Sequence, residues 1–204
     1  MKTLLAFLGV MSVATAVWAQ SNTVITFSEL GNVPANGLTF KGVTFSFKVQ
    51  GTNSTDAHFG ASGPGTLTYV SDPSLEGPTT GVLGFDFAVP VSHVSFGVAL
   101  AATTTLTPGV TVRFLDANQA QVNKIALETR PLISFTEGLV TEDGPPVSHV
   151  SIFFNNTAPA FVVDNLTFTT VPEPSAGMLC LAGLAALGLV KSISRVRARW
   201  SLRR

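Results

Sequence analysis

Two carboxylates, Glu29 and Asp164, stand in alternating apolar stretches near the two ends of the central part of the chain. Glu29 follows Ile25 at an even spacing and Asp164 precedes Leu166 at an even spacing, so in regular strands both carboxylates turn toward the apolar face. A buried carboxylate is costly unless a cation or several donors meet it, and Ca²⁺ prefers such oxygens. The pattern predicts a structural calcium ion at Glu29 and Asp164. The alternative is that Asp164 caps a turn with Asn165 and Glu29 is solvated.

The histidines do not form a hydrolytic site with serine. His93 and His149 each follow a serine directly, and neighbouring residues of a strand point to opposite faces. The chain has no Gly-x-Ser-x-Gly, His-Glu-x-x-His or glycine-rich phosphate motif. We therefore expect no enzyme and no required cofactor. The alternative, a polysaccharide-acting enzyme, needs paired carboxylates in one cleft, such as Asp56 and Asp72 about 5–10 Å apart.

A stretch rich in glycine, serine, threonine, asparagine and aspartate, residues 53–78, predicts loops. His58, Phe59 and Tyr69 lie within it and could line a sugar site, in which an aromatic platform stands beside polar groups. The alternative is that Phe59 belongs to the core and the others are ordinary loop residues.

The elements that must position these groups are short strands. Apolar and polar residues alternate with a period of two, which is typical of antiparallel sheets with one buried face. The body, residues 20–170, is long enough for one domain. We predict an all-β, antiparallel β-sandwich, a jelly roll. The clearest alternating segments are 43–49, 83–89, 94–98, 110–114 and 150–154.

One heptapeptide occurs twice. Pro90-Val-Ser-His-Val-Ser-Phe96 returns as Pro146-Val-Ser-His-Val-Ser-Ile152. Two copies do not make a repeat protein. The interpretation is that two strands begin through similar proline-led turns.

The chain begins with a signal-peptide pattern. Lys2 precedes an apolar stretch, and Val17-Trp-Ala19 fits cleavage by signal peptidase, so residues 1–19 are expected to be removed. The only cysteine, Cys180, lies near the C-terminus, so the exported body contains no disulfide. The body carries eleven acidic and five basic residues, a net charge of −6, which argues against nucleic-acid binding.

The C-terminal segment, residues 171–204, combines three features. Pro172-Glu-Pro174 comes first, then an uncharged stretch that predicts a transmembrane helix over about residues 175–193, then basic residues. The positive charge predicts a cytoplasmic C-terminus and an exported body. An unprocessed membrane anchor is the alternative. The basic residues begin with Lys191, Arg195, Arg197 and Arg199.

Pro172, Glu173 and Pro174, followed by the apolar span and the basic end, resemble the PEP-CTERM sorting signal of exported bacterial proteins. The resemblance covers residues 171–204 and implies that an exosortase, a membrane cysteine protease, removes or exchanges this segment. It also implies a host that makes extracellular polysaccharide. Prolines on both sides of Glu173 favour an extended, accessible peptide, which suits a protease substrate.

The body is similar to exported galactose-binding-like jelly rolls. The similarity rests on the ending Val163-Asp-Asn-Leu-Thr-Phe168 and on the phenylalanine-rich alternation. It implies that Glu29 and Asp164 correspond to the pair that holds a structural Ca²⁺ in that family.

Together these patterns predict an exported, non-enzymatic protein of the cell surface or extracellular matrix. It passes through the cell envelope, where the C-terminal segment holds it in the membrane before processing. The expected association is with exopolysaccharide or biofilm. A carbohydrate-binding module is the first alternative and a polysaccharide-acting enzyme is the second.

Overall fold

The computed structural model describes residues 21–171, which form one compact unit. The predicted signal peptide, the Pro172–Pro174 motif, the membrane segment and the basic residues from Lys191 lie outside the described residues. Across 21–171 we find no helix with the length and apolar character that a bilayer crossing requires.

Residues 21–171 fold into twelve strands, and every pairing between them is antiparallel. The predicted all-β, antiparallel class is therefore confirmed. The strands are β1 (Asn22–Ile25), β2 (Val33–Pro34), β3 (Thr39–Phe40), β4 (Val43–Val49), β5 (Thr52–Asn53), β6 (His58–Ala61), β7 (Ser74–Pro78), β8 (Gly81–Leu100), β9 (Leu106–Leu115), β10 (Gln121–Leu132), β11 (Phe135–Phe154) and β12 (Ala160–Thr170).

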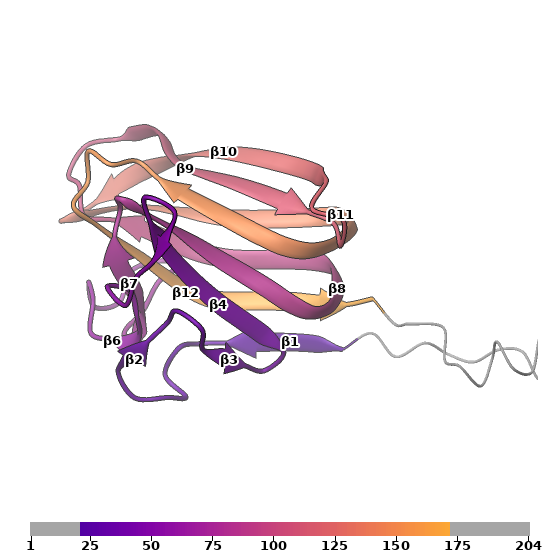
Figure 1. The fold of residues 1–204 in the computed structure, drawn as a ribbon. Coiled ribbons are helices and arrows are strands. Elements are labelled where there is room, and N and C mark those ends of the chain that lie inside the picture. The colour runs from indigo at the N-terminus through magenta and orange to yellow at the C-terminus, as the bar shows by residue number, and fades with distance from the viewer. Residues whose placement is uncertain (1–20, 172–204) are drawn as a thin grey trace, which may run out of the picture. The chain divides into compact units, whose positions relative to one another are not determined.

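One layer of the sandwich, which we call the front sheet, runs in the order β4, β8, β11, β9 and β10 (Figure 1). It contains residues 81–89 of β8 and 147–154 of β11. Buried residues such as Phe45 and Val112 alternate with outward ones such as Ser46 and Arg113. The alternation read from the sequence therefore sets which side chains face solvent on this sheet.

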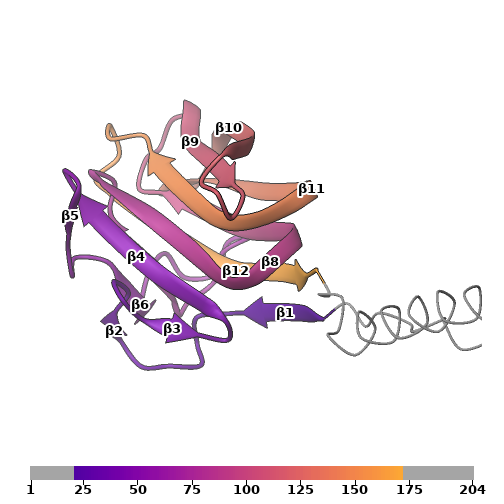
Figure 2. The same ribbon diagram turned by 45° about the vertical axis from the view of Figure 1, so that its right-hand side comes forward.

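The opposite layer, the back sheet, contains residues 135–143 of β11, residues 91–100 of β8, and β12 (Figure 2). The far side of β12 pairs with β1 and, further along, with β7, and β6 and β2 follow beyond β7. The strands β8 and β11 thus belong to both layers, and hydrogen bonds continue from one layer to the other through them.

The repeated heptapeptide lies where β8 and β11 pass between layers. Pro90 and Pro146 do not begin strands through turns, as the sequence suggested, but lie inside β8 and β11. The two copies face each other, with Val91 paired to Val147 and the regular register interrupted beside them. Proline donates no amide hydrogen bond and is accommodated where ladder pairing is broken.

The same pairing forms two His–Asp contacts. His93 Nδ1 lies 2.6 Å from Asp143 Oδ1, and His149 Nδ1 lies 2.5 Å from Asp86 Oδ1. Each pair joins β8 to β11, one on either side of the paired valines. The histidines are therefore cross-strand partners of carboxylates, with no serine between them.

Phenylalanine rings fill the space between the layers. Phe85 of the front sheet meets Phe96 of the back sheet edge to face, with ring centroids 5.7 Å apart. Phe154 stacks on Phe161 at 3.9 Å. Each such pair adds about 0.5–1.5 kcal/mol beyond the burial of its area. The rings that complete the core include Phe27, Phe45, Phe47, Phe59 and Phe114.

Candidate functional site

Glu29 does not turn into the core as regular alternation predicts. The strand β1 ends at Ile25, and Phe27 adopts a left-handed conformation with φ of 55°, so the spacing of two no longer fixes the face beyond it. Glu29 is exposed, and its Oε1 accepts hydrogen bonds from Lys41 Nζ at 2.8 Å and from the Thr26 amide at 3.3 Å. The Lys41 ammonium also donates to the Val24 carbonyl at 2.9 Å.

Asp164 is fully buried, but not on the face that regular alternation predicts. Asn165 is left-handed, with φ of 55°, and the register shifts after Asp164, so Leu166 and Phe168 enter the main core while Asp164 lies on the other face of β12. Its Oδ2 accepts hydrogen bonds from the amide and hydroxyl of Ser71, at 2.9 and 3.1 Å. The amide of Asn165 donates to Oδ1 and the side chain of Asn165 donates to Oδ2. Several donors therefore satisfy the Asp164 carboxylate, which ties the segment at Ser71 to β12.

Calcium binding at Glu29 and Asp164 stays a prediction. Both carboxylates already accept hydrogen bonds from donors of the protein. At Glu29, the Lys41 ammonium contacts the carboxylate and the Val24 carbonyl, which are oxygens of the kind that Ca²⁺ uses. Within residues 21–171, no three histidine, cysteine, aspartate or glutamate side chains gather closely enough to hold a metal ion.

The pKa values of the two carboxylates are shifted in opposite directions from their usual values. Burial raises the pKa of Asp164 above its usual value, and the hydrogen bonds from Ser71 and Asn165 only partly offset this. The negative charge of Glu29 raises it further. Partial burial also raises the pKa of Glu29, but the hydrogen bonds from Lys41 and Thr26 outweigh it, so this pKa lies below the usual value.

Tyr69 lies on a loop between β6 and β7, and its side chain is 40% exposed. The buried carboxylate of Glu137, on β11, accepts hydrogen bonds from the consecutive backbone amides of Thr68, Tyr69 and Val70. The side-chain amide of Asn165 donates to the Tyr69 carbonyl at 3.1 Å. This loop is therefore held from the back sheet through its backbone, which leaves the tyrosine ring at the surface.

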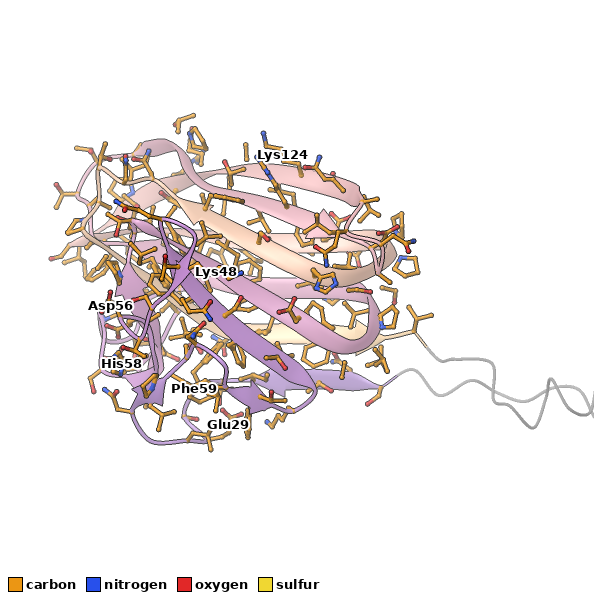
Figure 3. The ribbon with its side chains drawn as sticks, viewed as in Figure 1. Glu29, Lys48, Asp56, His58, Phe59 and Lys124 are labelled. Carbon is orange, nitrogen blue, oxygen red and sulfur yellow. The ribbon has the colours of Figure 1, made fainter. Side chains whose placement is uncertain are left out.

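His58 and Phe59 point to opposite sides of β6. Phe59 is fully buried, with its ring 4.8 Å from that of Phe27, and it belongs to the core. His58 lies at the surface, and its Nδ1 is 2.7 Å from Oδ1 of Asn32 (Figure 3). The structure therefore does not bring His58, Phe59 and Tyr69 together as one exposed sugar platform.

An open cavity of about 610 Å³, which we call the His58 cavity, lies beside β6 and β7. His58 and Glu76 face each other across these strands. Burial raises the pKa of Glu76, and the charge of Asp72 raises it further, against a hydrogen bond from Ser74. The lining side chains that carry polar groups are Asn32, Asp56, His58, Ser62 and Glu76.

Asp56 and Asp72, the carboxylates considered for an enzyme, make separate contacts. Asp56 lines the His58 cavity and accepts the Ser54 hydroxyl at 2.6 Å. Asp72 accepts the amides of Gly63 and Gly65 at 2.8 and 3.0 Å, and it is not among the residues that line this cavity. The second acidic group of the cavity is Glu76.

A second hollow, of about 500 Å³, opens at one end of the front sheet. We call it the outer hollow. Three chain segments meet there: the turn after β7, the start of β9 and the turn after β11. Its lining includes hydroxyls, amides and phenylalanine rings and contains no charged side chain. The lining residues are Thr79, Thr80, Gly81, Val82, Pro108, Gly109, Thr111, Phe153, Phe154, Asn155 and Asn156.

Asn155 holds the outer hollow together. Its backbone amide donates to the Gly109 carbonyl at 2.8 Å, and its side-chain amide donates to the Pro108 carbonyl at 2.9 Å. Asn155 Oδ1 accepts the amide and hydroxyl of Thr157, which closes the turn. Neither Thr80 nor Asn156, both exposed, uses its side chain in a hydrogen bond among the described residues, so both are available to a ligand.

Phe153 links the outer hollow to the open face of the front sheet. Its register partners are Thr111 on β9 and Val82 on β8, and all three side chains face outward. The guanidinium of Arg113 lies 4.9 Å from the centre of the Phe153 ring. The sequence signal for this surface is Phe153, an aromatic residue at an outward position of the alternating stretch 150–154. This signal does not indicate which turns complete the hollow.

No protein-family model matches the chain, and no curated protein matches it. Among solved structures, the K1 cleaved adhesin domain of Lys-gingipain from Porphyromonas gingivalis W83 is similar, at 12% identity over 74% of this chain and 99% of that one, with a TM-score of 0.47. A mutant of CBM29-2, a family 29 carbohydrate-binding module, is also similar. It is 10% identical over 74% of this chain and 93% of that one, with a TM-score of 0.38.

The CBM22-1–GH10 modules of Clostridium thermocellum xylanase 10B, solved with xylohexaose, are 15% identical over 72% of this chain and 28% of that one, with a TM-score of 0.42. Identities of 10–15% assign the chain to none of these families.

Proposed function

We propose that the body is a non-enzymatic polysaccharide-binding module, carried by a protein that is exported to the cell surface or the extracellular matrix. The outer hollow supports this proposal. Its exposed hydroxyl and amide groups can exchange hydrogen bonds with sugar hydroxyls, and the Phe153 ring offers an apolar surface beside them. The jelly-roll and galactose-binding-like assignments of the body remain part of the same proposal.

We propose that the C-terminal segment is the sorting signal that directs this module to the cell surface. The order of Pro172-Glu-Pro174, the uncharged stretch and the basic residues supports a PEP-CTERM signal that an exosortase processes at the membrane. The bound polysaccharide is then the matrix that retains the protein outside the cell.

The outer hollow can be tested by removing two ligand-facing groups. In the Thr80→Ala/Asn156→Ala variant no side-chain hydrogen bond found among residues 21–171 is lost, so the fold is expected to be unchanged. Loss of two hydrogen bonds to sugar is expected to weaken polysaccharide binding about tenfold in affinity electrophoresis. The matched control is His58→Ala in the other cavity, which is expected to bind as the wild type does.

Two results would overturn this assignment. Binding that is lost in His58→Ala and kept in Thr80→Ala/Asn156→Ala would move the site to the His58 cavity. Release of reducing sugar from the polysaccharide would make the protein an enzyme, for which Glu76 and Asp56 are the carboxylates that line one cavity.

A further inference from the structure

The basic residues of the body divide into two groups. Lys41 forms an ion pair with Glu29 at 2.8 Å, and Arg130 forms one with Glu128 at 2.9 Å. Among residues 21–171, the remaining three, Lys48, Arg113 and Lys124, form no ion pair with a carboxylate.

All three unpaired cations lie on the outer face of the front sheet. Arg113 on β9 is the direct register partner of Lys124 on β10, and both are exposed. Lys48 is exposed on β4, at the other side of the same sheet, where it pairs with Val82. Figure 3 shows Lys48 over β4 and Lys124 over β10, with β8, β11 and β9 between them.

This arrangement leaves three positive charges that no carboxylate among residues 21–171 neutralises. Like charges directly opposite each other on neighbouring strands repel, as Arg113 and Lys124 do here. The body has a net charge of −6, yet none of its eleven carboxylates forms an ion pair with these cations. An anionic ligand would relieve this repulsion, which makes the outer face of the front sheet a candidate binding surface.

The cations border the outer hollow. Val82, the register partner of Lys48, lines it, and so does Phe153, over which Arg113 lies. Neighbouring strands are about 4.8 Å apart, so Lys48 and Arg113, three strands apart, are separated by about 14 Å across the sheet. One small anion cannot contact both. A polymer that carries repeated negative charges can, with an uncharged part of a sugar in the hollow between them.

We propose that the outer face of the front sheet binds an acidic polysaccharide, a polymer whose sugars carry carboxylate or sulfate groups. Lys48, Arg113 and Lys124 contact the anionic groups, and the outer hollow contacts the sugar ring. This inference rests on the proposed polysaccharide-binding function and specifies its ligand class. Three cations on a body of net charge −6 do not form the extended basic surface that nucleic acids require.

The test compares two double variants of the full chain with the same loss of charge. Lys48→Gln/Lys124→Gln removes unpaired cations of the proposed face, and Lys41→Gln/Arg130→Gln removes paired cations elsewhere. Alginate, a polyuronate, is the acidic probe, and a neutral glucan is the second probe. Loss of two exposed charge contacts is expected to weaken alginate binding about tenfold in the first variant, with no change in the second.

Salt dependence gives an independent reading. Raising sodium chloride from about 0.05 M to about 0.5 M screens exposed charges and is expected to weaken alginate binding by the wild type more than by Lys48→Gln/Lys124→Gln. Glucan binding is expected to be weak and insensitive to salt. Circular dichroism of each variant verifies that the fold is kept.

The outcomes separate the two proposals. If the wild type binds glucan as tightly as alginate, or both double variants bind alginate equally, the acidic-ligand inference is wrong and the polysaccharide-binding function stands. If the wild type binds neither polymer, both proposals fall. Tighter binding to single-stranded DNA or to anionic lipid vesicles than to alginate would also overturn the inference.

Discussion

At the scale of single residues, Glu29 and Asp164 show how far alternation predicts a side chain's surroundings. Asp164 lies within β12 but at a register shift, beside the left-handed Asn165, and it is buried on the face opposite to Leu166. Glu29 lies beyond the end of β1, where the left-handed Phe27 breaks the period, and it pairs with Lys41 at the surface. Regular alternation thus fails at both carboxylates, past the end of a strand for Glu29 and at a bulge inside a strand for Asp164, because in each case one residue of positive φ interrupts the period.

The Glu29–Lys41 pair is expected to give the stability a defined pH dependence. The folded pKa of Glu29 is lowered, so the unfolded chain takes up this proton first as pH falls. The pair's contribution is present above the unfolded pKa, near 4.5, and is lost as pH falls through the lower folded pKa. The raised pKa of Asp164 acts in the opposite sense, since its contribution falls as pH rises. Because the two contributions oppose each other, the pH dependence that belongs to Glu29 is measured by comparing a Glu29 variant with the wild type.

Glu29→Gln is expected to lower the melting temperature by about 1–3 °C at pH 7, because a partly exposed ion pair contributes at most about 1 kcal/mol. Below the folded pKa of Glu29 the variant and the wild type are expected to melt together. Thermal unfolding followed by circular dichroism measures both. Glu128→Gln, at an exposed pair with Arg130, is the control and is expected to change little. An equal deficit at both pH values would contradict the linkage.

At the scale of elements, the segments that alternate regularly were predictable and their ends were not. The stretch 43–49 is β4, with the predicted face buried. The stretches 83–89 and 94–98, read as two strands, belong to the single strand β8, because Pro90 lies at a break in the pairing rather than at a turn. The outer hollow could not be read from the chain, since its three turns are far apart in sequence and only strand register brings them together.

The loop that carries Tyr69 is predicted to depend on Glu137. In Glu137→Gln an amide group replaces an acceptor that three backbone amides share, which leaves at least one buried donor unpaired, at a cost of about 1–3 kcal/mol. Hydrogen exchange of the Thr68, Tyr69 and Val70 amides is expected to accelerate, while β4 amides keep their protection.

Glu142→Gln is the matched control for this loop. Glu142 is also buried but accepts a side-chain amide of Asn123 on β10, 2.6 Å away, so its loss is not expected to reach the loop. Unchanged exchange at residues 68–70 in Glu137→Gln would show that the loop is held by other contacts.

At the scale of the whole molecule, the class of fold followed from periodicity and composition, whereas the arrangement of strands in two layers did not. A period of two gives the faces of each strand but does not say which strands pair. The predicted signal peptide and the C-terminal segment lie outside the described residues, so export and sorting stay predictions from the sequence.

Intact mass of the protein from its native cells tests the sorting proposal. We expect a species that starts at Gln20 and ends close to Pro172-Glu-Pro174, because both segments are then removed during export. Material from the envelope and from the medium should be compared. A species that still carries Arg204 in cells that contain an exosortase would make the segment a permanent anchor.

The position of β12 determines how the body would bear a mechanical load. Its end at Thr170 adjoins the first residues of β1, and β12 is hydrogen-bonded on one side to β8 and on the other to β1 and β7. If the C-terminal segment stayed in the membrane while a ligand was held on the front sheet, a pull from Val171 would load β12 along its length, across its hydrogen bonds. These bonds are then sheared together rather than opened one after another, so a molecule tethered in this way would resist detachment by flow before its last strand was drawn out.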